Sequence, residues 1–178
     1  MRIKEMVLAS LFAALMSIGG YIYIPIGPVP IVLNNLFVLL AGLVLGPLYG
    51  GLSVILYLLL GIAGFPVFAG GKSGLAHIVG PTGGYLFGFL VGAWLTGIIS
   101  RLKPFGKDII SSTAAAICGG LAIYVPGLIW LHIVSKMSWA KTLSVGFFPF
   151  LLGDAIKIVG AVLVAYKIRP YVSTSGVH

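Results

Sequence analysis

Acidic residues are almost absent from this sequence, which contains only Glu5, Asp108 and Asp154 against 11 lysines and arginines. Charged residues of both signs make up 8% of the 178 residues, whereas roughly 25% is usual in a soluble domain. So few charges cannot cover a globular surface, and 60% of the residues are hydrophobic. The composition therefore predicts an integral membrane protein and leaves no stretch long enough for a soluble catalytic domain.

Cysteine is nearly absent as well, since Cys118 is the only one. A single cysteine excludes an internal disulfide and a metal site built of cysteines. Cys118 lies in an apolar, glycine-rich run, where we expect a small core residue. No metal or other cofactor is expected.

What the sequence does contain is a series of six apolar runs bounded by glycine, proline or charge. They cover residues 6–24, 31–46, 48–64, 83–100, 109–134 and 142–166, and roughly 20 apolar residues cross a bilayer. The second and third runs are shorter than that and are separated only by Gly46-Pro47, so they are either tilted, tightly joined helices or one helical hairpin. We expect an all-α integral membrane protein with a single domain of six transmembrane helices over residues 1–178.

The basic residues fall unevenly between these runs. An even number of spans puts both termini on one side, and cytoplasmic termini give seven bases inside against three outside, as the positive-inside rule requires. The seven are Arg2, Lys4, Arg101, Lys103, Lys107, Lys167 and Arg169, and the three are Lys72, Lys136 and Lys141. This distribution explains the net charge of +8 without nucleic-acid binding, which is not expected.

Small residues recur at four-residue spacing in several runs. Two glycine ladders, Gly42, Gly46, Gly50 and Gly84, Gly88, Gly92, place one small residue per turn on one helical face, which lets helix backbones approach closely in lipid. Ala9 and Ala13 give the first helix a similar smooth stripe. The stripe serves either internal packing or docking of another membrane subunit.

A glycine-rich stretch around Lys72 resembles two catalytic motifs. A P-loop, Gly-x-x-x-x-Gly-Lys-Ser, requires glycine five residues before Gly71, but that position is Pro66. The string Gly71-Lys72-Ser73-Gly74 also matches the Gly-x-Ser-Gly string around the nucleophile of rhomboid intramembrane proteases, with His77 or His132 as the activating base. An intramembrane serine hydrolase is therefore an alternative, although a four-residue string is weak in a chain with 26 glycines.

Asp154 and Lys157 lie near the middle of the last run, which otherwise lacks charge. Their spacing of three places both on one helical face, and each costs roughly 2.5 to 3.5 kcal/mol at the centre of a membrane helix. They form either a neutralised structural pair or the polar lining of a water-accessible cavity. The second interpretation is favoured, because apolar residues replace a purely structural pair with little loss.

The chemistry of this pair suggests a ligand. A carboxylate that accepts beside an ammonium that donates matches a planar group with N–H next to C=O, such as a ureido ring. Lys72 would meet an acidic tail on the same ligand. Amides and hydroxyls on other helices add polar candidates: Asn34, Asn35, Ser53, Tyr57, Tyr85 and Tyr124. A stand-alone secondary transporter in which Asp154 relays a proton is an alternative, but no inverted repeat is visible.

Several ordered strings resemble the BioY family, the biotin-specific substrate-binding (S) components of energy-coupling factor (ECF) transporters. They are Gly27-Pro28-x-Pro30, Leu40-Ala41-Gly42-x-x-Leu45-Gly46, "PVFAGG" (66–71), "GPTGGY" (80–85) and Gly153-Asp154-x-x-Lys157. The resemblance implies an S-component-like six-helix bundle in a prokaryotic cell membrane. It implies a subunit that captures external biotin, has no ATPase activity of its own, and is energised by a T component and two ATPase subunits.

The resemblance also assigns roles to residues. Asp154 and Lys157 correspond to the pair that holds the biotin head group, and Ala9 and Ala13 match a motif for contact with the T component. From the residues themselves, we assign Lys72 to the valerate carboxylate and the loop 65–82 to a lid. The complete set of predicted ligand-binding residues is Asp154, Lys157, Lys72, Asn34, Asn35, Tyr85, Gly71 and Ser73; no catalytic residue is expected.

Overall fold

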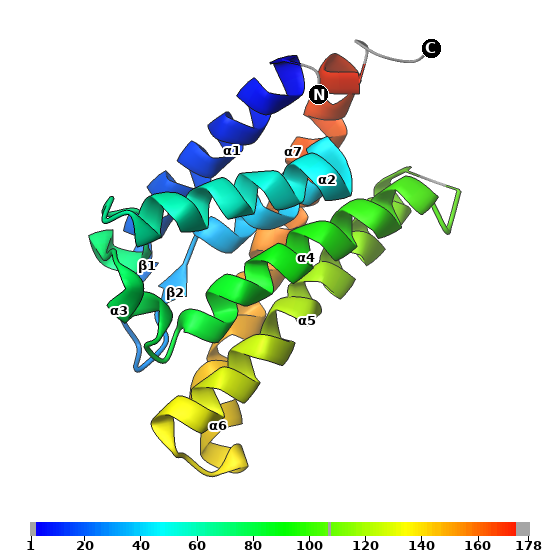
Figure 1. Cartoon of the computed structure of the whole chain (residues 1–178). Helices are drawn as coiled ribbons and strands as arrows, with labels where there is room; N and C mark the ends of the chain where they lie inside the picture. Colours follow the sequence, from blue (N-terminus) through cyan, green and yellow to red (C-terminus); the bar gives the residue numbers. More distant parts are fainter. Residues whose placement is uncertain (1–2, 107, 174–178) are drawn as a thin grey trace.

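The computed structural model describes residues 3–106 and 108–173, and the fold is almost entirely helical (Figure 1). The elements, in chain order, are α1 (Ile3–Tyr21), β1 (Tyr23–Ile24), β2 (Ile31–Val32), α2 (Asn34–Ile62), the 3-10 turn η1 (Ala69–Gly71), α3 (Leu75–Ile78), α4 (Gly83–Leu102), α5 (Asp108–Ser135), α6 (Trp139–Gly146), the 3-10 turn η2 (Phe148–Phe150) and α7 (Leu151–Ser173). In this part of the chain, α1, α2, α4, α5 and the stretch Trp139–Val172 are long and apolar enough to cross a membrane.

α2 is a helical hairpin that turns at Gly46. This residue has φ 79° and ψ −172°, a conformation that is essentially restricted to glycine, and Pro47 follows at a first helical position, where no N–H donor is needed. The two arms lie side by side, since Asn34 Nδ2 in one donates to the Tyr57 hydroxyl in the other at 3.1 Å. The hairpin interpretation is therefore confirmed. At 1.5 Å per residue the arms are about 18 and 24 Å long, shorter than the roughly 30 Å hydrocarbon layer.

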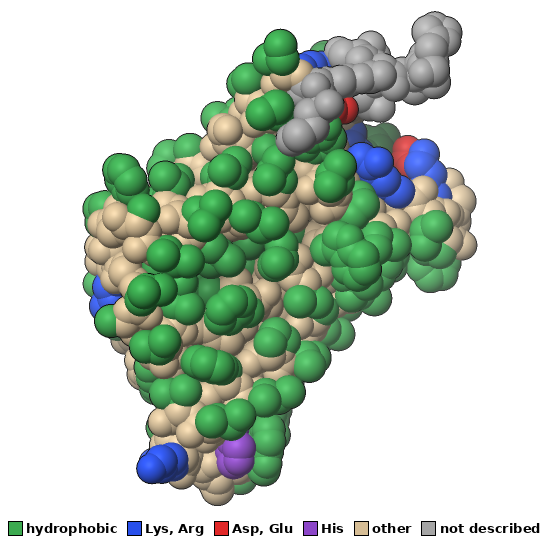
Figure 2. All heavy atoms as spheres, in the orientation of Figure 1, with side chains coloured by type: hydrophobic (Ala, Val, Ile, Leu, Met, Phe, Trp, Pro, Cys, Tyr) green, Lys and Arg blue, Asp and Glu red, His purple; other side chains and the backbone are tan. Residues whose placement is uncertain are grey.

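The prediction of six helices is confirmed by α1, the two arms of α2, α4, α5 and α7. These helices run between two ends of the bundle (Figure 1). The "terminal end" contains the start of α1, the turn of α2 and the ends of α4 and α7, joined for example by a bond from Lys4 Nζ to Val172 O at 3.4 Å. The "loop end" contains the antiparallel pair β1 and β2, the loop 65–82 and α6. Lysine and arginine side chains gather at the ends, and hydrophobic side chains cover the middle (Figure 2).

The glycine ladder of α4 packs helices together, as predicted, whereas Gly42, Gly46 and Gly50 do not share one helical face, because the chain reverses at Gly46. A Cβ atom on Gly42 of α2 would lie 2.5 Å from the Ala93 carbonyl oxygen of α4, and one on Gly88 of α4 would lie 2.4 Å from that of Ile123 in α5. Only glycine allows these backbones to approach so closely. α4 consequently lies between α2 and α5 and packs along both.

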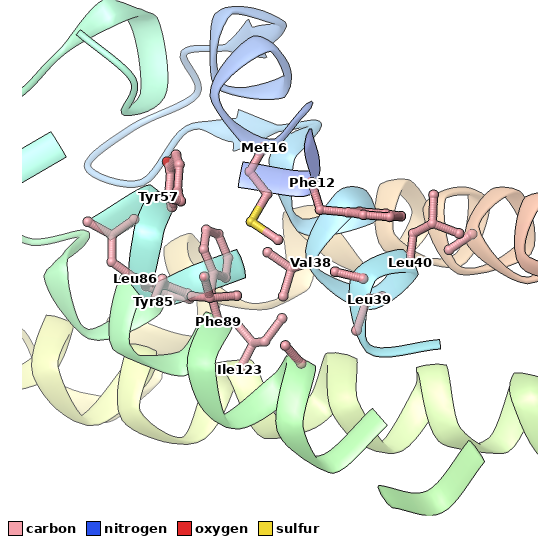
Figure 3. Close-up of a cluster of buried hydrophobic side chains, with 14 of the residues drawn as sticks. Phe12, Met16, Val38, Leu39, Leu40, Tyr57, Tyr85, Leu86, Phe89 and Ile123 are labelled. Carbon is pink, nitrogen blue, oxygen red and sulfur yellow. The ribbon is translucent and has the colours of Figure 1, made fainter. Parts of the chain in front are cut away.

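The smooth stripe of α1 faces the interior. Ala9 and Ala13 are 0% and 2% exposed, so the stripe serves internal packing in this structure and presents no free docking surface. Met16, on the same face, points toward Val38 of α2 within a core that Phe89 of α4 also enters (Figure 3).

Two local predictions are wrong. Cys118 is exposed on the outside of the bundle, because its neighbour Gly119 faces α4 and successive helical residues point roughly 100° apart. The last apolar run, predicted as one helix over 142–166, breaks at Phe147, where φ is −129° and ψ −64°. α6 ends before this break and α7 begins at Leu151. Asp154 therefore lies in the first turn of α7 and not in the middle of a helix.

Candidate ligand-binding site

A cavity of about 60 Å³ lies between the helices near the loop end. We call it the central cavity. Its walls come from the segment before α2, the start of α2, the loop 65–82, α4, α5, η2 and α7. Its polar lining residues are Asn34, Asn35, His77, Thr82, Tyr85, Tyr124, Asp154 and Lys157. Five of the eight predicted ligand-binding residues thus meet in one place: Asn34, Asn35, Tyr85, Asp154 and Lys157.

Asp154 is the centre of the polar network in this cavity. Its Oδ1 accepts from Asn35 Nδ2 at 2.9 Å and from Lys157 Nζ at 3.0 Å. Its Oδ2 accepts from the Tyr124 hydroxyl. Three donors from three helices therefore converge on one carboxylate whose side chain is 16% exposed. These hydrogen bonds hold the carboxylate at a fixed position in the cavity wall.

Lys157 is more deeply buried than its partner, at 7% exposure. A buried ammonium is stable only with a compensating charge, and Asp154 supplies it three residues away on the same helix face. The ammonium carries three N–H donors, and the bond to Asp154 uses one of them. The pair is neutral as a whole but keeps donors that a ligand can use.

Two amide oxygens beside the pair have no hydrogen-bond partner among residues 3–106 and 108–173. Asn34 is 2% exposed, and its Nδ2 bonds to Tyr57, but its Oδ1 is buried without a hydrogen bond. Asn35 Oδ1 is in the same situation, while its Nδ2 bonds to Asp154. Buried acceptors without partners are uncommon in folded proteins. Here both belong to residues that line the central cavity, where a ligand N–H group would satisfy them.

Aromatic rings form one wall of the cavity. The rings of Tyr85 and Tyr124 meet edge to face at 6.1 Å, and Tyr124 meets Phe147 in the same way at 4.8 Å. The Tyr85 hydroxyl donates to the Gly146 carbonyl oxygen at 2.8 Å. Tyr85 thus offers the cavity its ring, because its hydroxyl is already used to hold α6 against α4.

The loop 65–82 closes the cavity from the loop end. Phe68 is fully buried, with its ring 5.6 Å from that of Tyr57 and 5.2 Å from that of His77. His77 Nε2 lies 3.3 Å from Thr82 Oγ1. Burial lowers the pKa of His77, and the positive charge of Lys72 lowers it further. His77 is therefore neutral at pH 7 and serves as a packed wall residue.

The remaining three predicted residues do not line the central cavity. Lys72 is exposed, and Gly71 and Ser73 are half-buried in the same loop. Lys72 is still near the cavity, because its charge acts on His77. Within the described residues no hydrogen bond joins Ser73 to a histidine, since His77 pairs with Thr82 and His132 stacks on Trp139 at 4.1 Å. The nucleophile and base that a serine hydrolase requires are thus not paired.

Sequence reasoning missed His77 and Thr82 as lining residues and placed Tyr124 only among general polar candidates. The signal for Tyr124 was the presence of a hydroxyl in an apolar run, which also fits a tyrosine anchoring at the membrane interface. For His77 the string "LAHIVG" contains no pattern that distinguishes a cavity wall from a surface loop.

The arrangement can bind a small neutral polar group by hydrogen bonds. Asp154 accepts, Lys157 donates, and the unpartnered Asn35 oxygen accepts. Charged partners make such hydrogen bonds worth about 1.5 to 3 kcal/mol each. Apolar and aromatic walls surround this polar group, as is usual for small-molecule sites.

Comparison with known proteins gives consistent results. Residues 1–174 match the sequence profile of the BioY family. The "Biotin transporter BioY" of Thermotoga maritima is 42% identical over 166 residues, which cover 93% of this chain and 96% of that protein. The "Probable biotin transporter BioY" of Pyrococcus horikoshii is 40% identical over 169 residues, covering 95% and 98%. A crystal structure of the S-component for biotin from an ECF-type ABC transporter superposes with a TM-score of 0.87 at 32% identity, covering 94% of this chain and 92% of that one.

Proposed function

Since the chain belongs to the BioY family, we propose that it captures biotin in the central cavity and delivers it inward as the membrane-embedded subunit of an ATP-driven ECF transporter. It is a substrate-binding subunit and not an enzyme. The observation that carries the proposal is the ion pair of Asp154 and Lys157 in the cavity wall, beside an amide oxygen of Asn35 without a partner.

The ureido ring of biotin offers two N–H donors and one carbonyl acceptor. Asp154 and Asn35 can accept hydrogen bonds from these N–H groups. The Asp154 carboxylate can accept about four hydrogen bonds and accepts three in this structure. Asn35 Oδ1 accepts none among the described residues. Lys157 donates to the ureido carbonyl with one of its remaining N–H groups. The rings of Tyr85 and Tyr124 pack against the apolar part of the bicyclic ring system.

We assign the valerate carboxylate to the side of the cavity that the loop 65–82 covers. Lys72 remains our proposed partner for it, with Gly71 and Ser73 in the adjoining backbone. Lys72 has a flexible four-carbon stem, and its charge acts on the ring of His77, which lines the cavity. Thr82, which lines the cavity, adds a neutral donor on the same side.

The loop 65–82 acts as a lid. Cavities that hold small molecules usually measure about 300 to 1,000 Å³, whereas the central cavity measures about 60 Å³. Its walls must therefore move to admit biotin. The loop contributes Ala69, His77 and Thr82 to the lining, so its displacement enlarges the cavity while leaving the helices in place.

The terminal end of the bundle faces the cytoplasm in our proposal, and the protein lies in the cytoplasmic membrane of its cell. The excess of basic residues near the terminal end supports this orientation. Biotin then reaches the loop end from outside. A T component and two ATPase subunits complete the transporter. Docking through Ala9 and Ala13 stays a prediction, and it requires α1 to move, because both residues are buried against the bundle.

The test is a biotin titration of the purified chain in detergent, followed by the fluorescence of Trp94, Trp130 and Trp139. We expect a saturable response at micromolar biotin or below, because Trp130 Nε1 bonds to Gly80 O in the lid segment at 2.9 Å and reports its displacement. A second sample receives a ureido-free analogue of equal size and should not respond. A folded protein that shows the same response to both compounds contradicts the proposal.

A further inference from the structure

A second cavity, larger than the first, lies at the terminal end of the bundle. We call it the terminal cavity; its volume is about 840 Å³. It is bounded by the start of α1, the turn of α2, the ends of α4 and α7 and the start of α5. Apolar side chains such as Leu8, Val44 and Val172 form part of its wall. None of its lining residues belongs to the central cavity.

The charged residues that line the terminal cavity do not balance. Four are basic, Lys4, Arg101, Lys103 and Arg169, and two are acidic, Glu5 and Asp108. Asp108 is already paired with Lys103, at 2.9 Å. Across residues 3–106 and 108–173, neither arginine lies within ion-pair distance of a carboxylate.

The two arginines are held in place by neutral oxygens. Arg101 Nη2 donates to Leu45 O at 2.9 Å. Arg169 Nε donates to Leu43 O at 2.9 Å, its Nη1 donates to Ser112 Oγ at 3.2 Å, and its Nη2 donates to Ser100 Oγ at 3.0 Å. These bonds satisfy the last carbonyl groups of the first arm of α2. They fix both guanidinium groups without neutralising them, since Asp108 acts on Arg169 only through space and is itself paired with Lys103.

Capping alone does not explain this arrangement. A neutral amide caps a carbonyl as well, and the half-buried Arg169 has no carboxylate within ion-pair distance, among the described residues, to offset its desolvation. Each guanidinium has five N–H donors, of which Arg169 uses three and Arg101 one. The planar fork of unused donors fits the oxygens of a phosphate group. The cavity also lies at the ends of α4 and α7, and the ends of helices that cross a bilayer come close to the lipid headgroups.

We propose that the terminal cavity binds a phosphate group, with Arg101 and Arg169 as its ligands. The phosphate belongs either to the headgroup of an anionic phospholipid, whose glycerol part would lie along Leu8 and Val44, or to a soluble phosphate compound. This site goes beyond the proposed function and does not depend on biotin.

The experiment compares the purified wild-type chain with Arg101→Gln, and with Lys141→Gln as the control that removes one exposed base at the opposite end. The glutamine amide retains a donor for Leu45 O but removes the charge, and a cooperative melt verifies that the variant folds. Each protein is placed in nanodiscs containing phosphatidylglycerol in a phosphatidylcholine background, and lipids retained after detergent extraction are counted by native mass spectrometry. A parallel arm titrates inorganic phosphate in detergent and follows the melting temperature.

We expect wild type and Lys141→Gln to retain phosphatidylglycerol in preference to phosphatidylcholine, and Arg101→Gln to lose that preference by about tenfold or more, as the loss of a charge-assisted hydrogen bond implies. If phosphatidylglycerol is not preferred but inorganic phosphate raises the melting temperature of wild type and not of Arg101→Gln, the ligand is a soluble phosphate compound. If neither ligand binds, or if both variants behave as wild type does, the site is refuted. Capture of a partner protein by the arginines in place of either ligand would also overturn it.

Discussion

Replacing Asp154 by asparagine tests the central ion pair with an almost unchanged shape. The asparagine side chain cannot neutralise Lys157, which is 7% exposed, and it turns one oxygen acceptor into a donor that faces Tyr124 or Lys157. Removing one partner of a buried ion pair costs about 3 to 5 kcal/mol. For a domain of this size each kcal/mol lowers the melting temperature by about 2 to 4 °C, so we expect a decrease of about 6 to 20 °C.

The double variant Asp154→Asn/Lys157→Met separates stability from binding. Without the buried ammonium, no unpaired charge remains, and replacement of a whole ion pair by neutral groups is often neutral for stability. We therefore expect the double variant to regain most of the lost melting temperature. Biotin affinity should not return, because two charged partners of the ureido ring are gone. Each is worth about 1.5 to 3 kcal/mol, or roughly 10- to 150-fold in affinity.

The assay measures both quantities on the same sample, by thermal unfolding and by biotin titration in one detergent. Lys167→Met is the matched control, since Lys167 is exposed on the same helix and its loss should change neither. A double variant that is stable and binds biotin as wild type does would refute the reasoning, because the pair would then be purely structural. The reasoning also fails if Asp154→Asn melts at the wild-type temperature, since Lys157 would then not depend on Asp154 for its charge.

Three further predictions concern the lid and the hairpin. Lys72→Ala should weaken the binding of biotin more than that of a biotin amide without the carboxylate, and equal losses in a titration of both would remove Lys72 as the carboxylate partner. Burial lowers the pKa of His77 in the folded state, so the unfolded state takes up a proton at a higher pH than the folded state does. The stability of the fold should therefore decrease as the pH drops below about 6.5. The melting temperatures at pH 7.5 and pH 5 should differ less in His77→Gln than in wild type, and an unchanged pH dependence would contradict this. Gly46→Ala should lower the melting temperature by about 2 to 12 °C, since the backbone conformation at this position costs about 1 to 3 kcal/mol for a residue other than glycine. The Cβ atom of the alanine would also lie 2.2 Å from the Arg101 side chain. Gly51→Ala is the control for that change, because its Cβ atom would meet only Leu90 Cδ1 at an ordinary 3.6 Å; equal melting of the two variants would contradict the role of the turn.

The course of the main helices follows from the sequence because a helix that crosses the hydrocarbon layer needs roughly 20 predominantly apolar residues. This requirement does not distinguish two tilted, tightly joined helices from a helical hairpin at Gly46-Pro47, since both leave the apolar pattern unchanged. It also does not find the break at Phe147, because the surrounding segment "GFFPF" is as apolar as the helix that follows. The break depends on how the aromatic rings pack, and Phe147 meets Tyr124 from a different helix.

Tertiary contacts bring to Asp154 partners that are distant in the chain. Lys157 was identifiable because helical periodicity alone places it beside Asp154. Tyr124 and Asn35 are 30 and 119 residues away, and no local pattern connects them with the carboxylate.

The choice between Asn34 and Asn35 illustrates what periodicity can and cannot decide. Neighbouring helical residues point roughly 100° apart, so one rigid helix start cannot direct both amides at the same carboxylate. One of them must therefore turn elsewhere, and helical periodicity does not decide which. In the structure Asn34 turns to Tyr57 across the hairpin, and Asn35 turns to Asp154. The hairpin determines which amide reaches Asp154. The second arm of α2 folds back and places the Tyr57 hydroxyl beside Asn34, so Asn35 is the residue that contacts the carboxylate.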